Sequence, residues 1–390
     1  MTALGPRHEP AVRGREKRRV AILGSTGSIG TTALRVLARQ RERFTVTALT
    51  AHSNERQLAE QVAAWNPSFV GLVSPNGTSA GAGWITGAQA LVDAATRADV
   101  DIVLNAIVGV AGMDATLAAL AAGKRVALAN KESLVVAGEL ATAACATGGG
   151  EIVPVDSEHS AILQCLGARG AKDVRRLIIT ASGGPFRDWD ASRIAAATRE
   201  AALNHPTWSM GRKITVDSAT LANKALEVIE AHFLFGLPYD RIEVVVHPQS
   251  VVHSMVEFVD GSVLAQVGVP SMELPILYSL THPERLPDAD IPRFDPVAVS
   301  PLTFEPVRLD TFPALRLGIE AGRAGGLAPA TFNAANEAAV ALFLDGQISF
   351  GGIAAGIDRA LAKVSSMTSP TRDDLMDADR RARAIVKESA

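Results

Sequence analysis

Short apolar runs alternate with stretches of helical periodicity through the first 155 residues. Runs of four to six mostly apolar residues predict strands, and apolar positions three and four apart predict helices. The expected strands are 20–23, 44–49, 69–73, 101–105, 125–129 and 152–155, and the expected helices are 31–40, 54–65, 113–122 and 133–147. This alternation predicts a mostly parallel sheet that helices cover on both faces.

The pattern changes after residue 156. Strands are expected at 177–180 and 242–246, and two apolar runs, 251–259 and 262–267, flank Asp260-Gly261. An Asp-Gly pair in that setting predicts a hairpin with a type I′ turn. Antiparallel strands beside helices indicate an α+β unit, and a hairpin of this kind often lies in an oligomer interface.

Seven prolines fall between Pro283 and Pro313 and predict an extended linker. Helical spacing then dominates, with helices expected at 314–324, 330–344, 353–363 and 372–386. The predicted fold class is therefore α/β, with three domains. They are a Rossmann-like parallel-sheet domain (18–155), a central α+β domain (156–282) and, after the linker (283–313), a C-terminal helical bundle (314–390), all preceded by a disordered basic tail (1–17).

Composition narrows the class of protein. The chain has 390 residues, of which 47% are hydrophobic and 20% charged, and its net charge is −3. These values are typical of a globular, soluble protein and argue against nucleic-acid binding. No apolar run is long enough to span a membrane. The cysteines, Cys145 and Cys165, do not form a disulfide framework, so we expect a cytoplasmic protein.

A glycine-rich segment, Gly24-Ser25-Thr26-Gly27-Ser28-Ile29-Gly30, follows the first strand and opens the first helix. Its G-x-x-G-x-x-G spacing fits either a dinucleotide site or a structural turn, and the strand–helix–strand context favours the dinucleotide. No acid stands at the end of the second strand, where Ser53, Asn54 and Arg56 could instead bind a 2′-phosphate. NADP is therefore favoured over NAD. Alternatively, Asn54 is a helix N-cap with Gln57 at N3.

Other polar residues also follow strands. Asn105-Ala106 and Asn130-Lys131-Glu132 stand at the carboxyl ends of later strands, where open α/β sheets bind ligands. The alternative for Asn130-Lys131-Glu132 is solvated capping at a helix start.

Asp156, Glu158 and Glu227 are candidate metal ligands. Carboxylate oxygens favour Mg²⁺ or Mn²⁺ over Zn²⁺. The alternative for Asp156-Ser157-Glu158 is a polar turn after a strand. Asn223, Lys224 and Glu227 share one face of a helix expected around 218–235, and Lys224 with Glu227 could also be an ordinary surface ion pair.

The segment 182–212 has little periodicity. Ser182-Gly183-Gly184-Pro185 follows a strand and could form a phosphate-binding nest or an ordinary turn. Trp208 and Met210 suit a mobile lid over a substrate, or alternatively fill the core.

Together these segments resemble the 1-deoxy-D-xylulose 5-phosphate reductoisomerase family, over about residues 18–390. The motifs that carry the resemblance are Gly24 to Gly30, Ala129 to Ser133, Pro154 to Ala161, Ser182 to Arg187, His205 to Lys213, Val216 to Glu230 and His247 to Ser250. The chain departs from the family at His52-Ser53-Asn54, where many members carry a lysine.

The resemblance implies a homodimer that uses NADPH and Mn²⁺, Mg²⁺ or Co²⁺. It implies isomerisation and reduction of 1-deoxy-D-xylulose 5-phosphate, a small sugar phosphate, to 2-C-methyl-D-erythritol 4-phosphate in non-mevalonate isoprenoid biosynthesis. The implied cofactor residues are Thr26, Gly27, Ser28, Ile29, Asn54, Asn130, Glu132, Gly211 and Met272. The implied metal ligands are Asp156, Glu158 and Glu227, which with Lys131 are catalytic.

The remaining implied residues bind the substrate. Lys131, Ser157 and Glu158 would face its carbon chain, with Glu227 reaching it through the metal. Ser182, His205, Ser218, Asn223 and Lys224 would take its phosphate, and Trp208 would lie on the closing loop. The alternative activity is a metal-dependent NADP dehydrogenase of another sugar phosphate without rearrangement. A nucleotide-sensing protein that keeps the fold is a further alternative.

Overall fold

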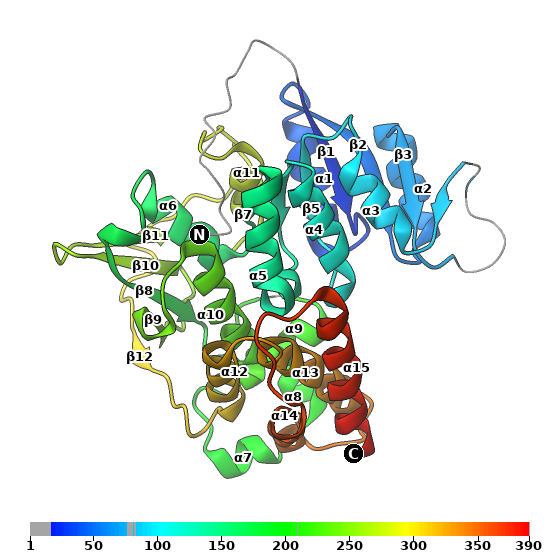
Figure 1. The fold of residues 1–390 in the computed structure, drawn as a ribbon. Coiled ribbons are helices and arrows are strands. Elements are labelled where there is room, and N and C mark those ends of the chain that lie inside the picture. The colour runs from blue at the N-terminus through cyan, green and yellow to red at the C-terminus, as the bar shows by residue number, and fades with distance from the viewer. Residues whose placement is uncertain (1–16, 76–80, 82, 209, 390) are drawn as a thin grey trace. The chain divides into compact units, whose positions relative to one another are not determined.

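A computed structural model describes residues 17–75, 81, 83–208 and 210–389 (Figure 1). The chain divides into two compact units. The first unit comprises Met1–Ser133, Gly138–Ser160 and Ser271–Ile291, and the second comprises Leu134–Ala137, Ala161–Pro270 and Pro292–Ala390. Except for Lys17, the expected basic tail lies outside the described residues. The three-domain division stays a prediction.

The first unit is built on a seven-stranded sheet in the order β4-β3-β2-β1-β5-β6-β7, and all its strand pairs are parallel. The strands are β1 (Arg18–Leu23), β2 (Phe44–Ala51), β3 (Phe69–Leu72), β4 (Ile85–Thr86), β5 (Ile102–Asn105), β6 (Arg125–Leu128) and β7 (Glu151–Pro154). β2 and β5 lie on opposite sides of β1, so the chain reverses its winding direction beside β1. Open α/β sheets bind ligands at such a reversal, outside the carboxyl ends of the strands.

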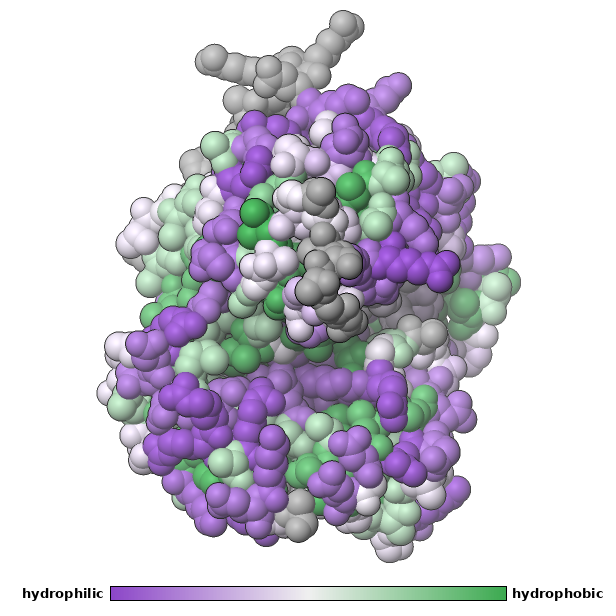
Figure 2. All heavy atoms as spheres, turned by 90° about the vertical axis from the view of Figure 1, so that its right-hand side faces the viewer, coloured by the Kyte–Doolittle hydropathy of each residue, from purple (hydrophilic) through white to green (hydrophobic). Residues whose placement is uncertain are grey.

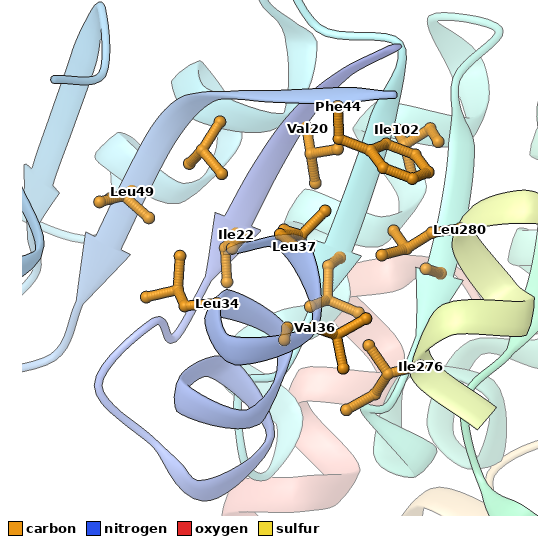
Figure 3. Packing of buried hydrophobic residues seen from close by; sticks show 14 of the residues in the cluster. Val20, Ile22, Leu34, Val36, Leu37, Phe44, Leu49, Ile102, Ile276 and Leu280 are labelled. Carbon is orange, nitrogen blue, oxygen red and sulfur yellow. The ribbon is translucent and has the colours of Figure 1, made fainter. Parts of the chain in front are cut away.

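Helices accompany these strands, and all of them except α6 and α11 lie between two strands of the sheet. They are α1 (Ser28–Arg39), α2 (Glu55–Trp65), α3 (Gln89–Thr96), the short η1 (Val110–Gly112), α4 (Met113–Ala121) and, after a long excursion of the chain, α11 (Glu273–Thr281); α5 (Lys131–Gly148) and α6 (Ser157–Leu166) divide between the two units. In Figure 3, side chains of α1 and α11 gather with those of β1 and β2 in one apolar cluster. Ile276 of α11 and Val20 of β1 are fully buried there.

The second unit contains a mixed five-stranded sheet in the order β11-β10-β8-β9-β12. Its strands are β8 (Val174–Ala181), β9 (Ile242–Val246), β10 (Val252–Phe258), β11 (Val263–Val267) and β12 (Glu305–Pro306). β8 pairs with β9 in parallel, and the other pairs are antiparallel. The α/β fold class predicted from the sequence is confirmed.

The helices of the second unit fall into two groups. The short η2 (Ala171–Asp173) comes just before β8. Between β8 and β9 lie α7 (Ala191–Ala195), α8 (Arg199–Leu203), α9 (Arg212–Thr220), α10 (Ala222–Phe235) and η3 (Tyr239–Arg241). The C-terminal bundle contains α12 (Pro313–Ala324), α13 (Ala328–Leu344), α14 (Phe350–Lys363) and α15 (Arg372–Glu388), with α13 packed against the other three. Figure 2 shows mostly hydrophilic side chains on the α15 side.

Several local expectations were wrong. The β10–β11 hairpin forms, but only Gly261 takes a positive φ (+86°), whereas a type I′ turn needs positive φ at Asp260 too. The helix expected at 218–235 is interrupted at Leu221, whose φ is +59°. The segment 182–212 contains two short helices. Within the described residues, no helix is long and apolar enough to cross a bilayer.

Candidate active site

The glycine turn between β1 and α1 is fixed from both sides. The N–H groups of Gly24 and Ser25 donate to the Thr50 carbonyl of β2 at 3.0 and 2.8 Å. Gly24 has a φ of +81°, and a Cβ on Gly30 would lie 2.4 Å from the Gly24 carbonyl oxygen. Gly27, at the N-cap of α1, is exposed and makes no side-chain cap, so the first helical turn presents its N–H groups outward.

Asn54 caps α2, as the alternative interpretation expected. Its side chain accepts a hydrogen bond from the Gln57 N–H at 3.2 Å and donates to the Gln57 side chain at 2.8 Å. Asn54 is nevertheless exposed. Its predicted cofactor contact stays a prediction.

Asn130, at the end of β6, caps α5 but is fully buried, so it is not solvated capping chemistry. Its amide donates to the carbonyls of Ile107 and Gly109 at 2.8 and 2.9 Å, and its oxygen accepts from the Ser133 N–H. The same amide lies 3.2 Å from the Glu132 carboxylate. These contacts fix the segment after β5 against the start of α5.

Lys131 and Asp156 form an ion pair in the first unit. Lys131 opens α5, Asp156 follows β7, and each side chain is 11% exposed. The Asp156 carboxylate also accepts the Glu158 N–H at 3.1 Å, which starts α6, and the Ser157 hydroxyl donates to Glu158 at 2.6 Å. The structure thus gathers Lys131, Asp156, Ser157 and Glu158 at the carboxyl edge of neighbouring strands β6 and β7.

Ser182, His205 and Ser218 meet in the second unit. His205 Nε2 lies 3.0 Å from the Ser182 hydroxyl oxygen and 3.1 Å from that of Ser218. Ser182 follows β8 and also accepts the Gly184 N–H at 3.2 Å. Gly183 and Gly184 take positive φ, and a Cβ on Gly184 would lie 2.7 Å from the Ser218 carbonyl oxygen. Hydroxyls, an imidazole and a glycine turn therefore converge, as anion sites require.

Backbone hydrogen bonds set the tautomer of His205. Its Nδ1 accepts from the N–H groups of Thr207 and Trp208 at 3.1 and 2.9 Å. The neutral ring must then carry its proton on Nε2, which points at the two serine hydroxyls. Burial and, secondly, the nearby Arg187 guanidinium lower the pKa of His205. The lowered pKa favours the neutral ring, which donates through Nε2.

Asn223, Lys224 and Glu227 meet on the first turns of α10. The Asn223 amide donates to Glu227 at 2.5 Å, and Lys224 forms an ion pair with the other carboxylate oxygen. The side chains of Lys224 and Glu227 are 6% and 1% exposed, which excludes the ordinary surface pair. Ser218 lies before the break at Leu221, and these three residues lie after it.

The other candidates are dispersed. Trp208 is half-buried, with its ring centre 6.4 Å from that of His253, and Gly211 is the N-cap of α9; both belong to the second unit. Met272 packs beside the apolar cluster of the first unit, and apart from Gly211 the other cofactor candidates belong to that unit too. Of the metal candidates, Asp156 and Glu158 belong to the first unit and Glu227 to the second.

Sequence reasoning missed residues that hold the candidates in place. Thr116 of α4 links Asn105, 2.8 Å away, to Ser133, 3.1 Å away, beneath Asn130. Asn336 of α13 donates to the buried Asp217 at 2.8 Å, one residue before Ser218. Neither carries a local signal in the sequence: Asn336 is followed by Glu337, and each acts through a residue that is distant along the chain.

A parallel sheet with a glycine turn at its winding reversal places the first unit in the class of dinucleotide-binding folds. Sequence models of 1-deoxy-D-xylulose 5-phosphate reductoisomerase match residues 20–138, and models of its C-terminal domains match residues 152–235 and 267–385. The chain belongs to the 1-deoxy-D-xylulose 5-phosphate reductoisomerase family, so the resemblance drawn from its motifs is confirmed.

Known relatives match along nearly the whole chain. The enzyme of Chloroherpeton thalassium is 50% identical over 383 residues, 96% of this chain and 98% of its own length. The Zymomonas mobilis reductoisomerase in complex with NADPH has a TM-score of 0.88 and 43% identity, over 96% of this chain and 99% of that one. A reductoisomerase in complex with NADPH, fosmidomycin and magnesium has a TM-score of 0.89 and 37% identity, over 95% and 98%.

Proposed function

We propose that this chain converts 1-deoxy-D-xylulose 5-phosphate into 2-C-methyl-D-erythritol 4-phosphate, by isomerisation and NADPH-dependent reduction with a divalent metal. The observation that carries this is 50% identity to a reductoisomerase over 96% of the chain. A dehydrogenase without rearrangement has no such support.

The first unit fits NADPH. The uncapped first turn of α1 and the exposed Gly27 leave N–H donors for a pyrophosphate. NADPH, when bound, supplies the hydride. Thr26, Gly27, Ser28 and Ile29 hold its pyrophosphate region, and Asn54, Asn130, Glu132, Gly211 and Met272 complete the site in this proposal.

Asp156, Glu158 and Glu227 are the proposed metal ligands. Their oxygen donors suit Mg²⁺, Mn²⁺ or Co²⁺, and the deep burial of Glu227 fits a carboxylate that meets a cation rather than water. A metal held there would act as a Lewis acid on substrate oxygens. Lys131, already paired with Asp156, favours negative charge on those oxygens.

Ser182, His205 and Ser218 are the core of the proposed phosphate site. The neutral imidazole donates through Nε2, and both hydroxyls can turn their protons toward phosphate oxygens. Asn223 and Lys224 supply an amide donor and a cation, and charge-assisted bonds of this kind are worth about 1.5–3 kcal/mol each. Trp208, bound to His205 through its N–H, is placed to respond when the phosphate binds.

A homodimer and a cytoplasmic location complete the proposal. β11 is an edge strand of its sheet, and Val263 and Leu264 on it are 48% and 41% exposed. Exposed apolar edge strands are rarely left uncovered in native proteins, and a second copy of this hairpin is the partner that we propose. Light scattering should report a dimer, and Leu264→Lys should shift it toward the monomer.

The activity is tested by mixing the protein with 1-deoxy-D-xylulose 5-phosphate and NADPH and following loss of nicotinamide absorbance with and without Mn²⁺. A branched carbon skeleton in the product supports the proposal, whereas an unbranched reduced sugar supports the simple dehydrogenase. NADPH binding without any metal-dependent oxidation would leave only the nucleotide-sensing alternative.

Two variants test the residue roles. Glu227→Gln should nearly abolish turnover and leave NADPH binding intact; near-normal turnover at saturating Mn²⁺ would exclude Glu227 as a ligand. Lys224→Ala should raise KM for the phosphorylated substrate, and an unchanged KM would remove Lys224 from the phosphate site.

A further inference from the structure

Gln61 of α2 holds the glycine turn through two hydrogen bonds to one residue. Its Nε2 donates to the Ser25 carbonyl at 2.9 Å, and its Oε1 accepts from the Ser25 hydroxyl at 2.6 Å. Ser25 is fully buried and Gln61 is only 9% exposed. The side chain of Ser25 therefore points into the protein, whereas two later residues of the turn, Gly27 and Ser28, are exposed.

An apolar residue would be expected at position 61. Leu58, Gln61, Val62 and Trp65 share the inward face of α2 by their spacing of three and four residues. Burying an amide costs free energy unless its polar atoms are bonded. Both atoms of this amide meet Ser25, so the glutamine is matched to the turn and not to the apolar cluster around it.

The bond to the Ser25 carbonyl also orients the next N–H. In a trans peptide the C=O and the following N–H point in opposite directions. Because the Ser25 carbonyl points toward α2, the Thr26 N–H points away from it, toward the outer side of the turn. Within the described part of the chain, that N–H has no acceptor. With the peptide flipped, a carbonyl oxygen would instead face an incoming anion and repel it.

We propose that Gln61 is a positioning residue for the cofactor, because it fixes the Ser25–Thr26 peptide with the Thr26 N–H directed at the NADPH pyrophosphate. The inference rests on the proposed function, since NADPH is the anion in question. It assigns Gln61 no contact with the cofactor. Thr50 fixes the two N–H groups at the start of the turn, and Gln61 fixes the peptide that faces the ligand.

The test measures the NADPH dissociation constant by fluorescence titration in EDTA, without substrate, so that turnover plays no part. Gln61→Met keeps the side-chain length and removes both bonds; we expect NADPH to bind about tenfold or more weakly. Ser25→Ala should cost less, because the Gln61 bond to the Ser25 carbonyl remains. Gln61→Glu can accept from the Ser25 hydroxyl but cannot donate to the carbonyl, and should resemble Gln61→Met.

Gln89→Met is the matched control, since Gln89 lies on the surface at the start of α3 and bonds only Asp93 among the described residues. It should bind NADPH as the unaltered protein does. Thermal unfolding without ligand separates a structural role from a positioning role. If Gln61 were purely structural, its substitution would lower Tm and leave the NADPH dissociation constant unchanged. Unaltered affinity in both Gln61 variants overturns the inference alone. Failure of the unaltered protein to bind NADPH overturns the proposed function and the inference with it.

Discussion

Lys224→Met removes a charged partner from one of the most deeply buried carboxylates of the second unit. Glu227 is 1% exposed and Lys224 6%, and the two side chains form an ion pair on α10. Breaking a buried pair by deleting one member costs about 3–5 kcal/mol, since the remaining charge keeps its desolvation penalty. We therefore expect Lys224→Met to lower the free energy of unfolding by about that amount.

The double variant distinguishes a charge effect from simple loss of packing. Lys224→Met with Glu227→Gln leaves neither charge buried, so its cost should fall below the sum of the two single costs, by about 2 kcal/mol or more. Urea unfolding followed by circular dichroism, in EDTA and without nucleotide, measures all three.

Arg316→Met provides the matched control. Arg316 and Glu320 also form an ion pair on one helix of the second unit, α12, but their side chains are 48% and 53% exposed. Such surface pairs are worth about 0–1 kcal/mol. If Lys224→Met destabilised the protein no more than Arg316→Met, the reasoning from burial would be refuted.

Three further predictions follow from contacts in the two units. The pKa of His205 should lie below 6.5 in an NMR titration, and a measured value at or above 6.5 would contradict this. Because the pKa is lower in the folded protein, the contribution of His205 to stability is present above about pH 6.5 and is lost as the pH falls toward the folded pKa. Asn336→Leu should cost about 1.5–3 kcal/mol in urea unfolding, since the buried Asp217 loses a donor, and a cost under about 0.5 kcal/mol would count against that contact. Gly30→Ala should lower Tm, because its Cβ would lie 2.4 Å from the Gly24 oxygen, whereas Gly27→Ala, at 3.4 Å, should not; equal Tm values would disprove the steric argument.

Periodicity predicted most helices and strands, because burial on one face imposes it directly. It failed where the local sequence fits two structures. The break at Leu221 was missed since leucine favours helices, and α6 was missed because Asp156-Ser157-Glu158 also fits a turn. The Asp156 carboxylate accepts the Glu158 N–H, a contact that a helix start and a simple turn both use, so the sequence did not separate the two.

The sequence predicted the residues of the candidate site better than it predicted the residues that hold them in place. The serines, His205 and the α10 group were named from motifs, and the structure places each set together within the second unit. Thr116 and Asn336 were not foreseen, since each acts through a residue distant in sequence. Such partners become visible only when the chain is folded, because hydrogen bonds between helices leave no periodic pattern.

Leu221 sits between the helix that carries Ser218 and the helix that carries Lys224, in a backbone conformation that suits glycine. A left-handed leucine costs about 1–2 kcal/mol, yet its side chain is only 2% exposed. Full burial of a leucine side chain stabilises the folded state by about 1.5–3 kcal/mol, which offsets the strain of this backbone conformation. Glycine at position 221 would remove the backbone strain but would also lose the buried side chain. The buried leucine thus holds the corner between α9 and α10, and this corner sets the spacing between the Ser218 hydroxyl and the Lys224 ammonium group.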